Sequence, residues 1–270
     1  MTKDYLWTAS RARLRLFRVD EGKNLHWLFL PGGPGLGSES LIPLLEILNI
    51  PGTMWLLDLP GDGSNRTSTN KEAFSRWAEG LVEAVDALKN VILVGHSRGG
   101  MFALAAEELQ KKLKGLVLMT SAPDMSWQKE ISLPPLPEAD QAEEIYRRNP
   151  NNSDLKKCIL AGAPRMFFTK KGLEEGVKFF SQLPYNYETW QWAEEHFDPA
   201  YRAKWIPKDI PTLILSGEKD IAIPIKYFAG KPEFQRNNIL LKEIENAGHF
   251  PWMDNPLAVI AAFDEYVSLI

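Results

Sequence analysis

Short runs of apolar residues along the chain are separated by longer stretches in which apolar residues recur every three or four positions. Short apolar runs are typical of buried strands, whereas the longer spacing is typical of helices with one buried face. The runs occupy residues 25–30, 53–57, 91–94, 115–119, 211–215 and 239–244, and the helical spacing occupies 71–88, 101–113 and 256–270. Strands that alternate with helices predict an α/β fold, with a mostly parallel β-sheet flanked by helices.

Both ends of the chain give more detailed predictions. From Ala12 to Val19 charged and apolar residues alternate, which predicts a half-exposed strand near a sheet edge. A turn is predicted at residues 20–23 (Asp20, Glu21, Gly22 and Lys23), so we expect the chain to open with antiparallel pairing of residues 12–19 and 25–30. The closing helix is expected to start at Pro256. Its predicted inner face consists of Leu257, Ile260, Phe263 and Val267.

Residues 124–207 have a different character from the rest of the chain. The segment has no strong strand pattern, and prolines divide it into helical pieces that are rich in aromatic residues. A segment of this length with its own helices is an insertion rather than a loop. We therefore expect residues 1–123 and 208–270 to form an α/β core, and residues 124–207 to form a helical cap over the functional site.

Composition and charge exclude several classes of protein. The 31 basic and 35 acidic residues give a net charge of −4, and no basic block is long enough to follow nucleic acid. No apolar stretch approaches the 18 or so residues of a membrane span, and residues 1–30 contain no signal-peptide core. The single cysteine, Cys158, excludes an internal disulfide framework. We therefore expect a cytoplasmic protein that acts on a small molecule.

The first candidate for chemistry follows the apolar run at 91–94. Residues Gly95 to Gly99 fit the pattern Gly-x-Ser-x-Gly, in which the serine occupies a strained turn between a strand and a helix. Glycines are needed two residues to either side because a Cβ atom there would collide with the neighbouring strand or helix. The pattern predicts that Ser97 is a nucleophile.

A glycine-rich segment follows the apolar run at 25–30. Residues 31–37 contain too many glycines and prolines for regular structure. Backbone amides with no side chain in the way can point at a developing negative charge, as an oxyanion hole requires. We expect Gly33 to be the donor here, because Pro34 has no amide hydrogen.

Two further residues follow strand ends in the way that Ser97 does. Asp220 lies just after the predicted strand at 211–215, and His249 lies just after the one at 239–244. Reactive groups of an open parallel sheet gather at the carboxyl ends of its strands. A serine needs a base to take its proton and a carboxylate to orient that base, and the chain order serine, acid, histidine suits this architecture. We therefore expect Ser97, Asp220 and His249 to form a catalytic triad.

Taken together, these motifs resemble those of α/β-hydrolase fold proteins over nearly the whole chain. The matching segments are residues 31–35, 58–64, 95–100, 217–220 with Pro224, and 248–252. The resemblance implies that Ser97 is the nucleophile, His249 the base and Asp220 its orienting acid. It also implies an oxyanion hole made by the amides of Gly33 and Arg98.

The sequence predicts a serine hydrolase that cleaves carboxylic esters of small apolar acyl groups through an acyl-enzyme. Residues 31–35 are also similar to proline iminopeptidases, although those usually have histidine at the position of Pro31. An aminopeptidase needs acidic groups for the substrate amine, and Glu174, Glu175, Glu194 and Glu195 are available. Acyl transfer and a non-catalytic ligand-binding role are further alternatives.

Other candidate residues carry weaker signals. Asp124 also follows a predicted strand, but Asp220 has the better Gly-x-x-Asp-x-x-x-Pro setting. We expect His96 to pack within the turn and His196 to lie on the surface. No cluster of His, Asp or Glu has the spacing of metal ligands, so neither a metal ion nor a cofactor is expected.

Overall fold

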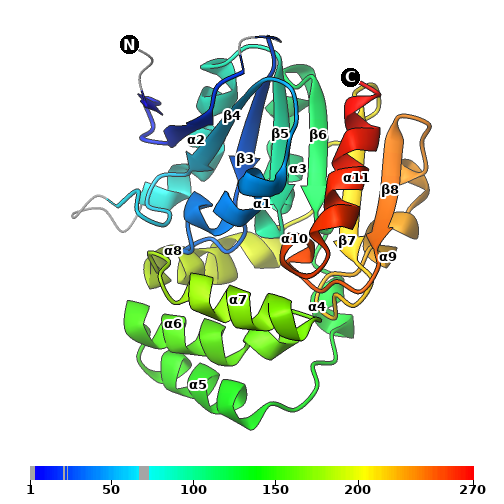
Figure 1. Cartoon of the computed structure of the whole chain (residues 1–270). Coiled ribbons are helices and arrows are strands. Elements are labelled where there is room, and N and C mark those ends of the chain that lie inside the picture. Colours follow the sequence, from blue (N-terminus) through cyan, green and yellow to red (C-terminus); the bar gives the residue numbers. More distant parts are fainter. Residues whose placement is uncertain (1–3, 21, 23, 67–72) are drawn as a thin grey trace.

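The computed structural model describes residues 4–20, 22, 24–66 and 73–270. Within these residues, eight strands form one sheet with the order β1-β2-β4-β3-β5-β6-β7-β8 (Figure 1). The strands are β1 (Tyr5–Trp7), β2 (Arg13–Arg18), β3 (His26–Leu30), β4 (Thr53–Asp58), β5 (Val91–His96), β6 (Gly115–Met119), β7 (Thr212–Gly217) and β8 (Ile239–Ile244). The strands from β3 to β8 are parallel, and β2 is antiparallel to β1 and β4. The predicted mostly parallel sheet is therefore confirmed.

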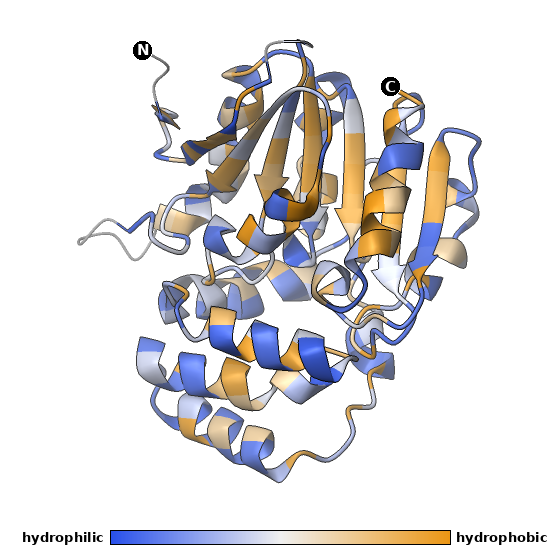
Figure 2. Cartoon of the chain, in the orientation of Figure 1, coloured by the Kyte–Doolittle hydropathy of each residue, from blue (hydrophilic) through white to orange (hydrophobic). Residues whose placement is uncertain are grey.

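Helices pack on both faces of this sheet. The helices of the α/β part are α1 (Ile42–Ile47), α2 (Trp77–Asp86), α3 (Arg98–Ala105), α9 (Lys226–Ala229), α10 (Pro251–Asp254) and α11 (Pro256–Val267). Neighbouring residues of β3 show how the two faces differ. Leu28 and Leu30 pack with residues of α2 and α3, whereas Trp27 and Phe29 pack with residues of α1 and α11. The central strands are hydrophobic along most of their length (Figure 2), as expected for strands that are buried on both faces.

The chain opens with antiparallel pairing as predicted, but residues 12–19 do not pair with residues 25–30. Strand β2 pairs with β1 and β4 instead, and β3 lies between β4 and β5, parallel to both. The reason is burial, because β3 is almost entirely apolar and requires a central position, whereas the alternating residues of β2 suit an edge. In the predicted turn, the Gly22 amide donates to Asp20 Oδ1 at 2.9 Å, and Glu21 and Lys23 lie outside the described residues.

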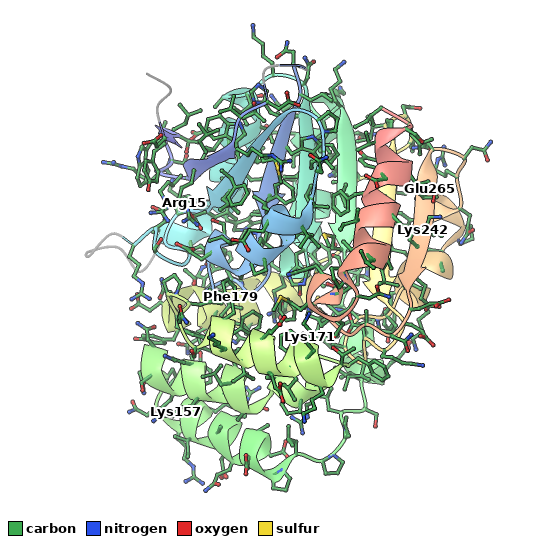
Figure 3. The ribbon with its side chains drawn as sticks, in the orientation of Figure 1. Arg15, Lys157, Lys171, Phe179, Lys242 and Glu265 are labelled. Atoms are coloured by element: carbon green, nitrogen blue, oxygen red, sulfur yellow. The ribbon has the colours of Figure 1, made fainter. Side chains whose placement is uncertain are left out.

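Helix α11 starts at Pro256 and buries Phe263, both as predicted, but the other residues of its buried face are different. The buried residues are Val259, Ala262, Phe263 and Tyr266, whereas Leu257 is 77% exposed. The rings of Phe263 and Tyr266 pack against Trp27, with centroids 6.3 and 6.1 Å away, and this aromatic contact sets the rotation of the helix. An ion pair of 2.6 Å between Lys242 of β8 and Glu265 joins the helix to the edge strand (Figure 3).

Residues 124–207, called the helical segment below, lie beyond the carboxyl ends of the parallel strands, in the lower part of Figure 1. Its helices are α4 (Trp127–Glu130), α5 (Pro137–Arg148), α6 (Asn152–Ala161), α7 (Lys170–Phe180) and α8 (Tyr187–Trp192), followed by a π-helical turn at Ala193–Phe197. Asp124 and Arg202 form an isolated bridge near its two ends. Within the described residues, none of the helices is long and apolar enough to span a bilayer.

Candidate active site

Ser97 occupies a tight turn between β5 and α3. Its backbone has φ 52° and ψ −125°, a strained conformation for a residue with a side chain. The neighbouring glycines make the turn possible. A Cβ atom on Gly95 would lie 2.6 Å from the Cα atom of Gly100, and one on Gly99 would lie 2.5 Å from the carbonyl oxygen of Pro31. The turn places Ser97 in the wall of a cavity.

Asp220 and His249 meet at the ends of β7 and β8. His249 Nδ1 and Asp220 Oδ2 are 2.9 Å apart, and both side chains are buried. The other carboxylate oxygen, Oδ1, accepts hydrogen bonds from the amides of Ala222 and Ile223 at 2.9 and 3.1 Å. Burial opposes ionisation of Asp220, but the charge of His249 and these hydrogen bonds outweigh it, so the pKa of the carboxyl group lies below its ordinary value. Asp220 is therefore an anion that holds the histidine ring.

Of the three residues of the predicted triad, Asp220 contacts His249 directly, and Ser97 shares only the cavity with His249. Ser97 and His249 line one cavity, but among the described residues no hydrogen bond joins their side chains. Catalytic hydrogen bonds are often long without a substrate and shorten when it binds. Asp124 is placed elsewhere, because its carboxylate accepts from Lys231 Nζ at 2.7 Å and from the amide of Ser126 at 2.9 Å. Asp220, and not Asp124, is the acid beside His249.

The glycine-rich loop lies next to the serine turn. Gly33 has φ 111°, which suits a residue without a side chain, and the Gly33–Pro34 peptide bond is cis. The Gly33 carbonyl accepts from Arg98 Nη1 at 2.8 Å, and the Gly35 carbonyl accepts from the amide of Asn186 at 2.8 Å. In the described part of the chain, the amides of Gly33 and Arg98 have no hydrogen-bond partner. Gly33 and Arg98 both line the cavity beside Ser97.

The side chain of Arg98 makes contacts that the sequence did not indicate. Its Nε and Nη2 atoms lie 2.9 and 2.5 Å from the two carboxylate oxygens of Asp198, in the helical segment. The guanidinium group also lies 5.5 Å from the ring centroid of Trp190. A charged residue at the start of the otherwise apolar helix α3 was the available signal, but its partner is 100 residues away in the sequence.

Asp62 is a second group that the sequence analysis missed. Asp62 is 1% exposed, and its Oδ1 atom accepts from the Gly35 amide at 2.6 Å, so it binds the backbone of the glycine-rich loop. Burial and the negative charge of Asp58 raise the pKa of Asp62 to about 7. This carboxyl group therefore changes charge near neutral pH.

We expect the Asp62→Asn substitution to change how stability depends on pH. In the folded protein the carboxyl keeps its proton up to about pH 7, but in the unfolded chain it loses the proton above its ordinary pKa of 3.8. The folded state therefore binds more protons between these values, and stability falls as the pH rises through this range. Between pH 5 and pH 8 the wild type should lose about 2 to 3 kcal/mol relative to D62N, whose amide oxygen can still accept from Gly35. Urea unfolding of both proteins at the two pH values measures the difference, and parallel pH profiles would contradict the expectation.

The cavity beside Ser97 has a volume of about 290 Å³ and lies between the glycine-rich loop and the helical segment. Apolar residues from both sides line most of it, including Leu36, Leu155, Trp190 and Phe250. Several charged residues of the helical segment also line it, and Arg147 and Arg165 are paired with Glu143 and Asp140 at 2.7 Å. The cavity thus suits an apolar group with few polar contacts.

The other histidines and the cysteine considered from the sequence have no contact with the described residues that indicates a catalytic role. His96 is buried against the rings of His249, Phe250 and Trp252, and burial lowers its pKa to about 3. Cys158 lines the cavity, and burial raises the pKa of its thiol to about 11. His196 is exposed. No three His, Cys, Asp or Glu side chains of the described residues are grouped so as to hold a metal ion.

Comparison with known proteins agrees with this architecture. Residues 27–263 match a family model described as the alpha/beta hydrolase family. The chain belongs to this family. Among curated relatives of the hydrolase is a putative esterase/lipase 2 of Mycoplasma pneumoniae, 25% identical over 232 residues, which cover 81% of this chain and 80% of the relative. A proline iminopeptidase of Saccharolobus solfataricus is 28% identical over 180 residues, which cover 61% of this chain and 56% of the relative.

Solved structures show the same fold. An alpha/beta fold family hydrolase from Bacillus anthracis aligns with a TM-score of 0.72 at 16% identity, covering 99% of this chain and 98% of the other. An esterase from Exiguobacterium antarcticum aligns with a TM-score of 0.70 at 18% identity, covering 99% of this chain and all of the other (100%). At these identities the likeness concerns the fold of the hydrolase.

Proposed function

We propose that this hydrolase is a serine hydrolase that cleaves carboxylic esters through an acyl-enzyme. The observation that carries the proposal is the 2.9 Å contact between Asp220 Oδ2 and Nδ1 of His249, a residue that lines the same cavity as Ser97. An ionised carboxylate in this position selects the tautomer of His249 with a proton on Nδ1, which leaves Nε2 free to act as a base.

In the proposed mechanism, His249 Nε2 takes the proton of Ser97 as the serine oxygen attacks the ester carbonyl. Asp220 stabilises the imidazolium cation that forms. The amides of Gly33 and Arg98 donate to the carbonyl oxygen as it becomes negative. His249 then protonates the departing alcohol, and afterwards activates the water molecule that releases the acid from Ser97.

The proposed substrate is an ester with a small, largely apolar acyl group. The apolar lining and the cavity volume of about 290 Å³ support this choice. We propose that residues 124–207 act as the cap over the site, because their helices form much of the cavity wall. The Mycoplasma relative, which is named as an esterase/lipase, supports the same reaction class.

A second candidate function is an aminopeptidase that recognises a free amine. Glu194 lines the cavity, and among the described residues its carboxylate forms no ion pair. The other three glutamates considered from the sequence are less suitable. Glu174 and Glu175 are exposed and lie near Lys170 and Lys171 on α7, and Glu195 is exposed and accepts from Gln191 at 2.9 Å. The proline iminopeptidase relative favours this candidate.

A fluorophosphonate probe and a pair of chromogenic substrates test the proposal. We expect the probe to label Ser97, and we expect p-nitrophenyl butyrate to be hydrolysed at least about 100-fold faster, in kcat/KM, than proline p-nitroanilide, a difference of about 3 kcal/mol in transition-state binding. A reversed preference would favour the aminopeptidase. Absence of both labelling and turnover would favour a non-catalytic binding protein, and a higher yield of a new ester when an alcohol is added would reveal acyl transfer.

A further inference from the structure

We propose that Arg98 is a positioning residue. Its side chain makes the geometry of the oxyanion hole depend on how the cap packs against the α/β core. The inference rests on the proposed function, because it concerns the amides that would stabilise the transition state. Arg98 contributes one of these amides through its backbone. Through its side chain it contacts the residue that contributes the other amide, and also the cap.

The first contact is with Gly33. Arg98 Nη1 donates to the Gly33 carbonyl oxygen at 2.8 Å. A glycine has wide conformational freedom, and Gly33 has φ 111°, so a hydrogen bond to its carbonyl oxygen limits the backbone orientations that it can adopt. Oxyanion stabilisation requires donors that are already oriented before the reaction. The guanidinium group therefore holds the residue whose amide has to point into the cavity.

The second contact is with Asp198 of the cap. The pair is bidentate, with atom separations of 2.9 and 2.5 Å, and the side chains of Arg98 and Asp198 are only 13% and 5% exposed. Gln128 Nε2 also donates to Asp198, at 3.3 Å. A planar guanidinium group that is held at two points has a fixed direction, so Asp198 determines where Nη1 points. The cap thereby acts on Gly33 through Arg98.

The cap contacts the same loop at a second position. The backbone amide of Asn186 donates to the Gly35 carbonyl at 2.8 Å. The side-chain Nδ2 atom of Asn186 donates to the carbonyl of Gly61, in the loop after β4, at 2.5 Å. Trp190, four residues further along α8, stacks near the Arg98 guanidinium and also lines the cavity. A substrate that packs against Trp190 therefore contacts a residue that itself packs on Arg98, the side chain that orients Gly33. We infer that a filled cavity and a well-formed oxyanion hole stabilise each other.

This arrangement affects the transition state more than the bound substrate. The amide of Gly33 is needed when the carbonyl oxygen becomes negative, whereas the acyl group is bound by the apolar walls of the cavity. Removing the contact that orients the Arg98 guanidinium group should therefore lower kcat and leave KM nearly unchanged.

The experiment compares Asp198→Asn, Arg98→Met and the double variant with the wild type. Each protein is assayed with p-nitrophenyl butyrate and with phenylboronic acid, which forms a tetrahedral adduct with an active-site serine and thereby probes the oxyanion hole. We expect D198N to lower kcat about 10- to 100-fold with KM within about threefold of wild type, and to weaken inhibition by the boronic acid by the same factor as kcat. In the R98M background, D198N should cause no further loss.

Asp124→Asn is the matched control, because it removes another ion pair, of 2.7 Å, between the start of the cap and Lys231 of the core. We expect its kcat and boronic acid inhibition to match the wild type. If D198N acts on KM alone, leaves boronic acid inhibition unchanged, or adds to R98M, the inference is overturned. If R98M does not fold, as judged by circular dichroism, the parallel loss of kcat and boronic acid binding in D198N still decides the question. Failure of the proposed function itself would appear earlier, as wild-type protein that neither hydrolyses the ester nor is labelled at Ser97.

Discussion

Ser97→Ala should lower the kcat for p-nitrophenyl butyrate by about 10⁶-fold, to the level of the residual catalysis that binding and the oxyanion hole provide. The reason is that alanine has no oxygen with which to form the acyl-enzyme, so the remaining groups have no nucleophile to activate. A steady-state assay at saturating ester measures the effect. The fluorophosphonate probe should no longer label the protein.

The fold of S97A is expected to remain intact. Alanine keeps the Cβ atom, so the close approach of Gly32, whose own Cβ would lie 2.7 Å from that of Ser97, is unchanged. Circular dichroism and the thermal midpoint should therefore match the wild type. Retained ester turnover by a folded S97A protein would exclude Ser97 as the nucleophile.

Asp220→Asn should lower kcat by about 10⁴-fold, the size of effect found when the triad aspartate of a serine protease is changed in this way. Asparagine has nearly the same shape, but its amide can donate to His249 Nδ1 and so favours the wrong tautomer of the ring. The charge that stabilises the imidazolium cation is lost as well. Comparing kcat for the two proteins at pH 8 measures the effect.

Asp124→Asn is the control for Asp220→Asn, as it is for Asp198→Asn. Asp124 is also a carboxylate after a parallel strand, but it pairs with Lys231 rather than with His249. We expect its kcat to stay within about threefold of wild type, as is usual for a partly exposed ion pair away from the chemistry. A large loss in D124N together with a small loss in D220N would move the orienting acid to residue 124.

Most of the sheet could be predicted from local patterns, and the errors have a common cause. Strands from residue 53 onwards lie where the apolar runs indicated, because each run is followed by its own turn or helix and all except β8, at the sheet edge, are almost entirely buried. The pairing of residues 12–19 was wrong because neighbouring strands in the sequence need not be neighbours in a sheet. The face of α11 was wrong because Trp27, more than 200 residues earlier, selects it.

Ser97, Asp220 and His249 could be found as candidates because each lies within a few residues of a strand end, and the ends of parallel strands lie on one edge of the sheet. The 2.9 Å contact of Asp220 with His249 is the part of that arrangement that the structure supplies. The roles of Asp62 and Asp198 could not be found. Asp62 lies in a loop and Asp198 begins a short 3₁₀ helix, and the groups that they bind, the Gly35 amide and the Arg98 guanidinium group, are distant from them in the sequence.

By itself, the sequence determined the elements whose formation depends on nearby residues: the buried strands, the glycine turn around Ser97 and the start of the last helix. These depend on apolar periodicity, on the absence of side chains and on proline, all of which act within a few residues. Only the tertiary structure decided which strands pair, which carboxylate accompanies His249 and which residue of the helical segment binds Arg98. The contacts of His249 with Asp220 and of Arg98 with Asp198 join residues 29 and 100 positions apart, and their free energy depends on burial and geometry that exist only once the whole chain is packed.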